Sequence, residues 1–165
     1  MPQEYKMQEA LKMAIQAKKN LMDFYLKAAE VTQHPEGKKV FTRLADEVKE
    51  NVGRFFDYYN RKDLGDFEEF INSPPRPDSV MLVELEKALN ADTHDRKARE
   101  LALKEEEDLE RHFRTAATSV VDPAVRDVFL AVAKETRNHY DVIESEYART
   151  MGMVHETDID TYVRE

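Results

Sequence analysis

The sequence predicts an all-α protein, an antiparallel bundle of four helices with a long crossover between the second and third helices. Three observations predict this fold. Apolar residues recur at alternating steps of three and four along most of the 165 residues, which places them on one stripe of each helix. The chain has 4 glycines, few for a fold rich in β-turns. Two short links and one long link between the periodic segments match one known bundle topology.

Each helix has its own boundary signals. We expect the helices at about residues 4–32, 37–62, 95–119 and 122–150. The first two are separated by a break that contains Pro35 and Gly37. The last begins at Asp122-Pro123, a pair typical of an N-cap followed by proline in the first helical turn.

The crossover, residues 63–94, contains the only proline cluster of the chain, between Asn72 and Ser79. We interpret this cluster as a linker. A short helix is expected at about residues 79–90, with Ser79 as its cap. Residues 1–150 are then one bundle domain, and residues 151–165 form a polar C-terminal tail.

The composition excludes several classes of function. The net charge is -9, which disfavours general binding to nucleic-acid phosphates. The chain has no cysteine, so a disulfide framework, a thiolate metal site and a cysteine nucleophile are all excluded. No apolar run is long enough for a membrane span, and the charged N-terminus lacks the apolar segment of a secretory signal. We therefore expect a cytoplasmic protein.

The first helical hairpin is repeated in the second at a constant offset of 88 positions. Pro35 corresponds to Pro123 and Phe41 to Phe129. The same offset relates alanines, a glutamate and a tyrosine: Ala10/Ala98, Ala14/Ala102, Ala28/Ala116, Ala29/Ala117, Ala45/Ala133, Glu47/Glu135 and Tyr59/Tyr147. This pattern predicts a bundle with two-fold pseudosymmetry.

Polar residues interrupt the apolar stripes near the middle of each helix. They are Lys18, Asn51, Glu106, Thr136 and His139. An isolated buried charge costs several kcal/mol, roughly, unless it finds a partner. The repeat relates Lys18 to Glu106 and Asn51 to His139, so we expect these side chains to share one layer of the bundle.

That layer has the spacing of a di-metal site. Ferritin-like di-iron proteins place a Glu on each of two helices and a Glu-x-x-His pair on each of the other two. Residues 5–150 also resemble the rubrerythrin branch of that superfamily. The stretches that carry the resemblance are Ala14–Tyr25, Leu44–Asn51 and Ala133–Tyr140. The resemblance implies iron as cofactor and reduction of peroxide or oxygen as chemistry. Without cysteine, the rubredoxin iron site that many rubrerythrins carry cannot be present.

Four of the six ligand positions depart from the family pattern. Lys18 and Val48 stand where the family has Glu, and Asn51 stands where it has His. In the second half, Glu106 and His139 match the family, whereas Thr136 replaces a Glu. A protonated lysine cannot bind a metal, and valine has no donor atom. We therefore expect the family metal ligands to survive only at Glu106 and His139, with doubtful occupancy.

Three interpretations remain open. The first is a ferritin-like protein that has lost its di-iron centre, binds no cofactor and has a structural, interaction or regulatory role, with Lys18 paired to Glu106. The second is an iron-binding oxidoreductase with a reduced ligand set at Glu106 and His139. The third is a small-molecule binder with its ligand in the bundle centre. The first predicts a lysine–carboxylate contact, and leaves open which protein or small molecule is the partner. The resemblance also implies a homodimer.

Overall fold

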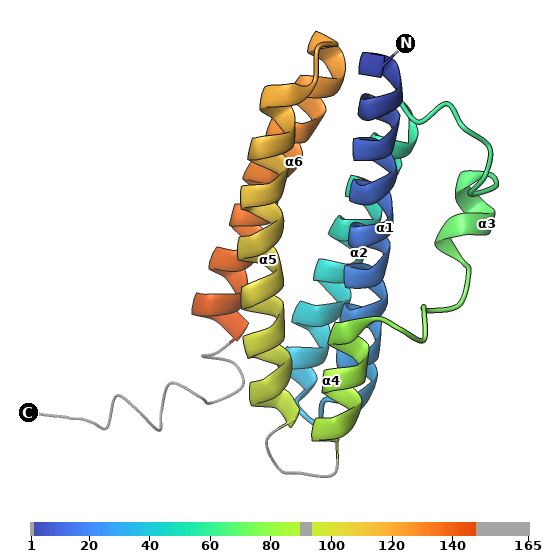
Figure 1. Cartoon of the computed structure of the whole chain (residues 1–165). Coiled ribbons are helices and arrows are strands. Elements are labelled where there is room, and N and C mark those ends of the chain that lie inside the picture. Colours follow the sequence, from blue (N-terminus) through green and yellow to red (C-terminus); the bar gives the residue numbers. More distant parts are fainter. Residues whose placement is uncertain (1, 90–93, 148–165) are drawn as a thin grey trace, which may run out of the picture.

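The computed structural model describes residues 2–89 and 94–147 of the chain, and these form helices, turns and loops. The elements are α1 (Pro2–Val31), α2 (Pro35–Phe56), α3 (Phe67–Ile71), α4 (Val80–Ala88), α5 (His94–Ser119), α6 (Pro123–Val142) and a π-helical turn, η1 (Ile143–Tyr147). The fold is the predicted all-α bundle, with α1, α2, α5 and α6 as its long helices (Figure 1). In the described residues, no helix combines the length and apolarity needed to cross a membrane.

The bundle consists of two hairpins. The closest packing is between α1 and α2 and between α5 and α6, whereas α1 and α5 approach each other less extensively. The short helix α4 packs against both α1 and α5, over one end of the seam between them (Figure 1). The two hairpins therefore meet mainly through side chains that point into the bundle.

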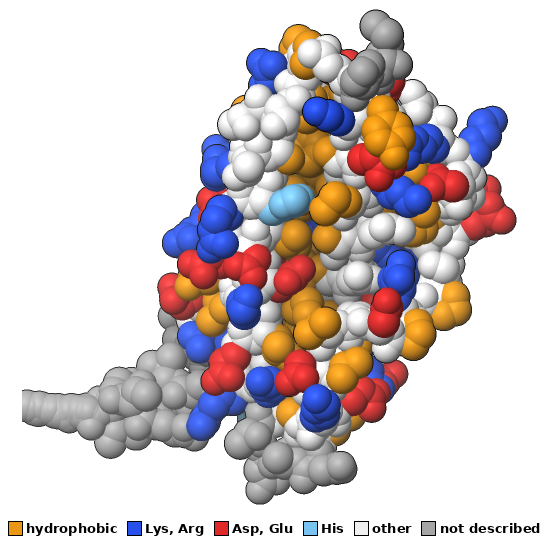
Figure 2. Space-filling model, in the orientation of Figure 1, with side chains coloured by type: hydrophobic (Ala, Val, Ile, Leu, Met, Phe, Trp, Pro, Cys, Tyr) orange, Lys and Arg blue, Asp and Glu red, His pale blue; other side chains and the backbone are white. Residues whose placement is uncertain are grey.

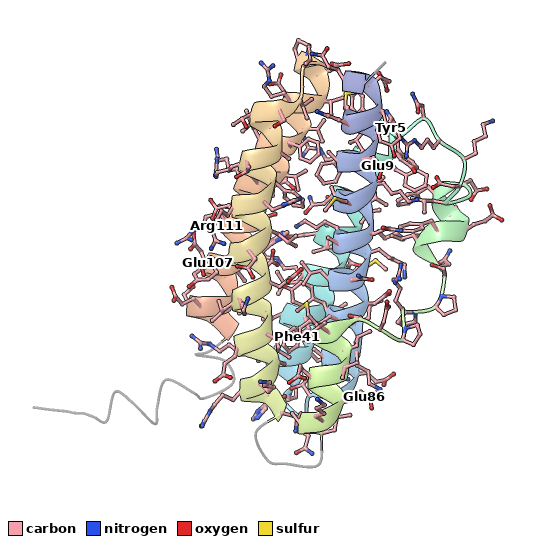
Figure 3. All side chains as sticks on the ribbon, viewed as in Figure 1. Tyr5, Glu9, Phe41, Glu86, Glu107 and Arg111 are labelled. Carbon is pink, nitrogen blue, oxygen red and sulfur yellow. The ribbon has the colours of Figure 1, made fainter. Side chains whose placement is uncertain are left out.

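Large apolar side chains fill the interior on both sides of the central layer. Phe55 packs against Phe113 and Phe129 with ring centroids 5.5 and 4.9 Å apart, and Tyr25 stacks on Phe41 at 6.0 Å. Figure 3 shows Phe41 inside the bundle, whereas charged side chains such as Glu86, Glu107 and Arg111 point outward. The excess negative charge thus lies on helix surfaces, as the apolar stripes require.

Helix α2 ends at Phe56, six residues before the predicted end at 62. The reason is a side chain from α1. Gln8 accepts a hydrogen bond from the Asn60 backbone N–H at 2.9 Å and donates to the Tyr58 carbonyl at 3.2 Å. These contacts satisfy backbone groups that a longer helix would have used, and the sequence periodicity of one helix does not show them.

The crossover contains one more helix than predicted. Helix α3 lies before the proline cluster, in a part of the crossover for which no helix was predicted. It begins with a capping box, in which the side chains of Asp66 and Glu69 each accept a hydrogen bond from the other's backbone N–H. Helix α4 lies within the predicted 79–90 segment, but Ser79 makes no side-chain capping bond. The linker after α3 is anchored to α1, because the buried Lys19 ammonium donates to the Ser73 carbonyl at 3.0 Å.

The structure tests the predicted start of the last helix. Asp122 caps α6 by accepting from the backbone N–H groups of Ala124 and Val125, as Asp122-Pro123 indicated. The predicted end at 150 and the tail 151–165 lie outside the described residues, which end with η1 at Tyr147.

Candidate functional site

The structure brings the six ligand-pattern positions into one buried layer in the middle of the bundle. Lys18, Val48, Asn51, Glu106 and Thr136 are fully buried, and His139 is 3% exposed. One position comes from each of α1 and α5, and two come from each of α2 and α6. This is the placement expected from the helical periodicity and the 88-residue repeat.

The ammonium group of Lys18 lies at the centre of this layer. It donates a hydrogen bond to Thr136 Oγ1 at 2.9 Å, and the Thr136 hydroxyl donates a hydrogen bond to the Val132 carbonyl at 2.7 Å. Glu106 Oε1 is 3.9 Å from the ammonium, and the Phe113 ring centroid is 5.7 Å away. Burial lowers the pKa of Lys18, against the opposing effect of the Glu106 charge.

The carboxylate of Glu106 is held by a phenol. Tyr25, which is fully buried, donates its hydroxyl proton to Glu106 Oε2 at 2.5 Å. Burial, followed by the neighbouring Glu106 charge, raises the pKa of Tyr25 well above its usual value, so the phenol stays a donor. The second oxygen, Glu106 Oε1, has no hydrogen-bond partner in the part of the chain that the structure describes and faces Lys18 at ion-pair distance.

The amide of Asn51 and the ring of His139 each lie at hydrogen-bond distance from a carboxylate outside the six ligand-pattern positions. His139 Nε2 lies 3.0 Å from Glu47 Oε1, and Asn51 Nδ2 donates to Glu135 Oε1 at 2.8 Å. Glu135 also accepts from Arg54 at 2.5 Å. Asn51 and His139 each pair with a half-exposed carboxylate of the opposite hairpin that was not predicted as a partner.

Burial lowers the pKa of His139, with the Glu106 charge as the main opposing effect. A neutral ring with its proton on Nε2 donates to Glu47. Its Nδ1 then faces Glu106 Oε2 at 3.7 Å, too far for a hydrogen bond.

The contacts of the layer obey the two-fold pseudosymmetry of the sequence. Tyr25 and Phe113 are 88 positions apart, like Lys18 and Glu106. Tyr25 contacts Glu106 while Phe113 contacts Lys18, so each hairpin supplies the aromatic group for the charge of the other. The carboxylate pairs are related in the same way: Glu47 to His139, and Glu135 to Asn51.

The residues of the layer do not fit a di-metal centre. The Lys18 ammonium lies beside Glu106, next to the place where a metal ion bound by this carboxylate would lie. A protonated amine has no lone pair with which to bind such an ion. Val48 offers no donor atom, and Thr136 is engaged by Lys18. Within residues 2–89 and 94–147, no group of three or more His, Cys, Asp or Glu side chains is arranged to hold a metal ion.

Sequence reasoning missed the roles of Tyr25, Glu47 and Glu135. A signal existed for the two glutamates, because the repeat aligns Glu47 with Glu135 and each lies four residues before Asn51 or His139. Tyr25 lies seven residues after Lys18, on the same stripe of α1. Its aromatic character suggested a core residue, and its hydroxyl partner follows only from the packing of α1 against α5.

Comparisons with known proteins agree with the bundle fold. Residues 9–147 match the family model described as rubrerythrin. No curated protein and no solved structure matched the chain. Because the matched region spans the whole bundle, from α1 to η1, the chain belongs to the rubrerythrin family.

Proposed function

We propose that this rubrerythrin-family protein has lost the di-iron centre and serves a non-catalytic structural, interaction or regulatory role. The observation that carries the proposal is the fully buried Lys18, whose ammonium lies 3.9 Å from Glu106 Oε1. A fixed cation of the chain then supplies positive charge at a position where the family holds metal ions.

The remaining contacts support this replacement. Lys18 has a hydroxyl acceptor in Thr136 and an aromatic face in Phe113. Glu106 has a phenol donor in Tyr25. Buried charges are tolerated when they are paired and hydrogen-bonded. The layer meets most of this requirement with its own side chains and needs no metal for charge balance.

One observation favours the alternative, an iron-binding oxidoreductase of peroxide or oxygen with a reduced ligand set. Glu47 lies beside His139, and His139 lies beside Glu106, so two carboxylates flank one imidazole. These three described side chains are not arranged to hold a metal ion together, and an ion bound by Glu106 would lie within reach of the Lys18 ammonium. We therefore regard the metal-free role as the better supported of the two.

Metal analysis tests the proposal. The protein is purified without chelators, its metal content is measured by elemental analysis, and Fe(II) is then titrated under anaerobic conditions. We expect a folded protein with no stoichiometric iron and no saturable Fe(II) binding. About two irons per chain would overturn the proposal. About one iron, lost in Glu106→Gln and accompanied by peroxide consumption, would establish the alternative.

The homodimer and the cytoplasmic location that the sequence led us to expect stay predictions. Light scattering tests the first, and cell fractionation tests the second.

A further inference from the structure

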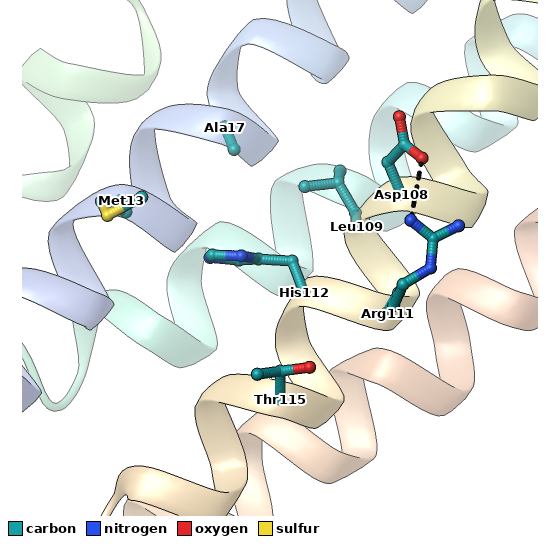
Figure 4. A pocket seen from close by; sticks show the side chains of 7 residues that line it. All are labelled: Met13, Ala17, Asp108, Leu109, Arg111, His112 and Thr115. Atoms are coloured by element: carbon teal, nitrogen blue, oxygen red, sulfur yellow. Dashed lines mark hydrogen bonds and ion pairs between the residues drawn. The ribbon is translucent and has the colours of Figure 1, made fainter.

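An open groove runs along the seam between α1 and α5. Figure 2 shows apolar side chains following this seam, with a histidine at its edge. A cavity of about 520 Å³ lies there, lined by Met13, Ala17, Asp108, Leu109, Arg111, His112 and Thr115. Figure 4 shows Met13 and Ala17 on α1 facing the α5 side chains across the seam. Met13 is 55% exposed, a large value for an apolar residue beside other apolar groups.

The other half of the same seam is covered by α4, which packs against both α1 and α5. Asn20 and Glu105 lie beside Met81 at the start of that helix. The 88-residue offset relates Glu105 to Ala17 and Asn20 to Asp108. Ala17 and Asp108 both line the open groove. The open groove is therefore the pseudosymmetric counterpart of the seat of α4. The crossover covers one of two related seats, and no element of residues 2–89 and 94–147 covers the other.

Helix α4 shows what such a seat accepts. Its residues Met81 and Leu85 are four positions apart and are 8% and 0% exposed. Residues four apart lie on the same face of a helix. Glu84 and Glu86 flank this apolar stripe. The seat thus takes a short amphipathic helix, with apolar residues one turn apart and carboxylates at its edges.

The rim of the open groove contains cations that can pair with the carboxylates of such a helix. Asp108 on α5 is paired with Lys104 at 2.8 Å and with Arg111 at 3.4 Å. Lys104 and Arg111 are the two cations beside this carboxylate, while Glu105 and Glu107 lie on the same stretch of α5, so the rim carries charges of both signs. His112 lies on the same rim. Acidic residues beside the apolar stripe of a partner helix can pair with Lys104 and Arg111, which fixes the position of that helix on the groove.

We propose that the α1–α5 groove binds an amphipathic helix of a partner protein, with large apolar residues four positions apart and acidic residues beside them. This inference rests on the interaction role proposed above and gives that role a surface. It is independent of the metal measurement, since Met13 and Thr115 lie outside the central layer. A protein free of iron that fails to bind such a helix would disprove only the present inference.

The probe is a fluorescent peptide of residues 79–89, the helix that occupies the related seat. An isolated peptide of this length is not helical in water. It is therefore stapled through positions 83 and 87, which are exposed in the fold. Fluorescence polarisation with the full-length protein should give saturable binding. The peptide with Met81→Asp and Leu85→Asp is its control and should not bind.

Surface variants locate the site. Met13→Glu and Thr115→Glu should each weaken peptide binding at least about tenfold, a loss of about 1.4 kcal/mol. Leu130→Glu is the matched control, because Leu130 is an exposed apolar residue on α6 and should leave affinity unchanged. Circular dichroism shows whether each variant is folded.

Three results would overturn the inference. The first is absence of saturable binding. The second is binding that Met13→Glu does not affect, since the peptide would then have displaced α4 from its own seat. The third is a dimer that becomes monomeric in Met13→Glu without peptide binding, because the groove would then be an interface between two copies.

Discussion

The two hairpins of the bundle are copies in sequence, yet their central charges are opposite. The hairpin of α1 and α2 contributes Lys18, and the hairpin of α5 and α6 contributes Glu106 at the equivalent position. Two carboxylates there would repel each other without a cation between them. The difference means that each half of the duplicated fold supplies the counter-charge of the other in the buried layer.

The comparison extends to the aromatic residues seven positions further on. The carboxylate half receives a phenol donor from Tyr25, and the ammonium half receives the ring of Phe113. A phenol suits an acceptor and an aromatic face suits a cation. The hairpins thus differ in charge and in the group that each offers to the other, while the helix positions remain the same.

The largest effect should come from restoring equal charges in the two halves. Lys18→Glu brings two buried carboxylates together and removes the cation. We expect a loss of about 3–5 kcal/mol in the free energy of unfolding, measured in urea. Lys104→Glu, which changes an exposed residue on α5, is the control and should cost less than about 1 kcal/mol. An equally small loss for Lys18→Glu would contradict the proposed pairing.

A double-mutant cycle should show that the two charges act as a pair. Lys18→Met leaves the buried Glu106 without its cation and should cost about 3 kcal/mol. Adding Glu106→Gln removes the second charge while keeping an acceptor for Tyr25. We expect the double variant to recover at least about 1 kcal/mol relative to Lys18→Met, measured by urea unfolding. Strict additivity of the two single changes would show that they are independent.

Removing the Tyr25 hydroxyl tests the difference between the two aromatic partners. Tyr25→Phe removes a donor to a buried carboxylate and should cost about 1.5–3 kcal/mol in unfolding free energy. In the background of Glu106→Gln the same change should cost less, about 1 kcal/mol, since the acceptor is then neutral. A similar cost in both backgrounds would mean that Tyr25 stabilises the bundle through packing alone.

The smallest effects should arise at the carboxylates that pair across the hairpins near the surface. Glu135→Ala leaves the buried Asn51 amide without its acceptor and should cost about 1–2 kcal/mol. Glu47→Ala also removes an acceptor, that of His139 Nε2, but the neutral ring can move its proton to Nδ1, which faces Glu106, so this change should cost less than about 1 kcal/mol. Thermal unfolding of both variants at pH 7 measures the order. A larger loss for Glu47→Ala than for Glu135→Ala would contradict this explanation of the two pairs.

The sequence by itself determined the all-α bundle, the repeat, and the layer in which Lys18 and Glu106 meet. Helical periodicity decides which side chains share a face, and the offset of 88 decides which positions are equivalent, so both can be read from one chain. The local capping signal at Asp122 was equally readable.

Only the tertiary structure decided the individual partners. Thr136, rather than Glu106, is the nearest hydrogen-bond partner of Lys18, and Asn51 contacts Glu135. The side chain of Gln8, from another helix, satisfies backbone groups just beyond the end of α2. These contacts depend on how far one helix is shifted and rotated against its neighbour. Periodicity within a single helix does not fix that shift, whereas the packing of the core does.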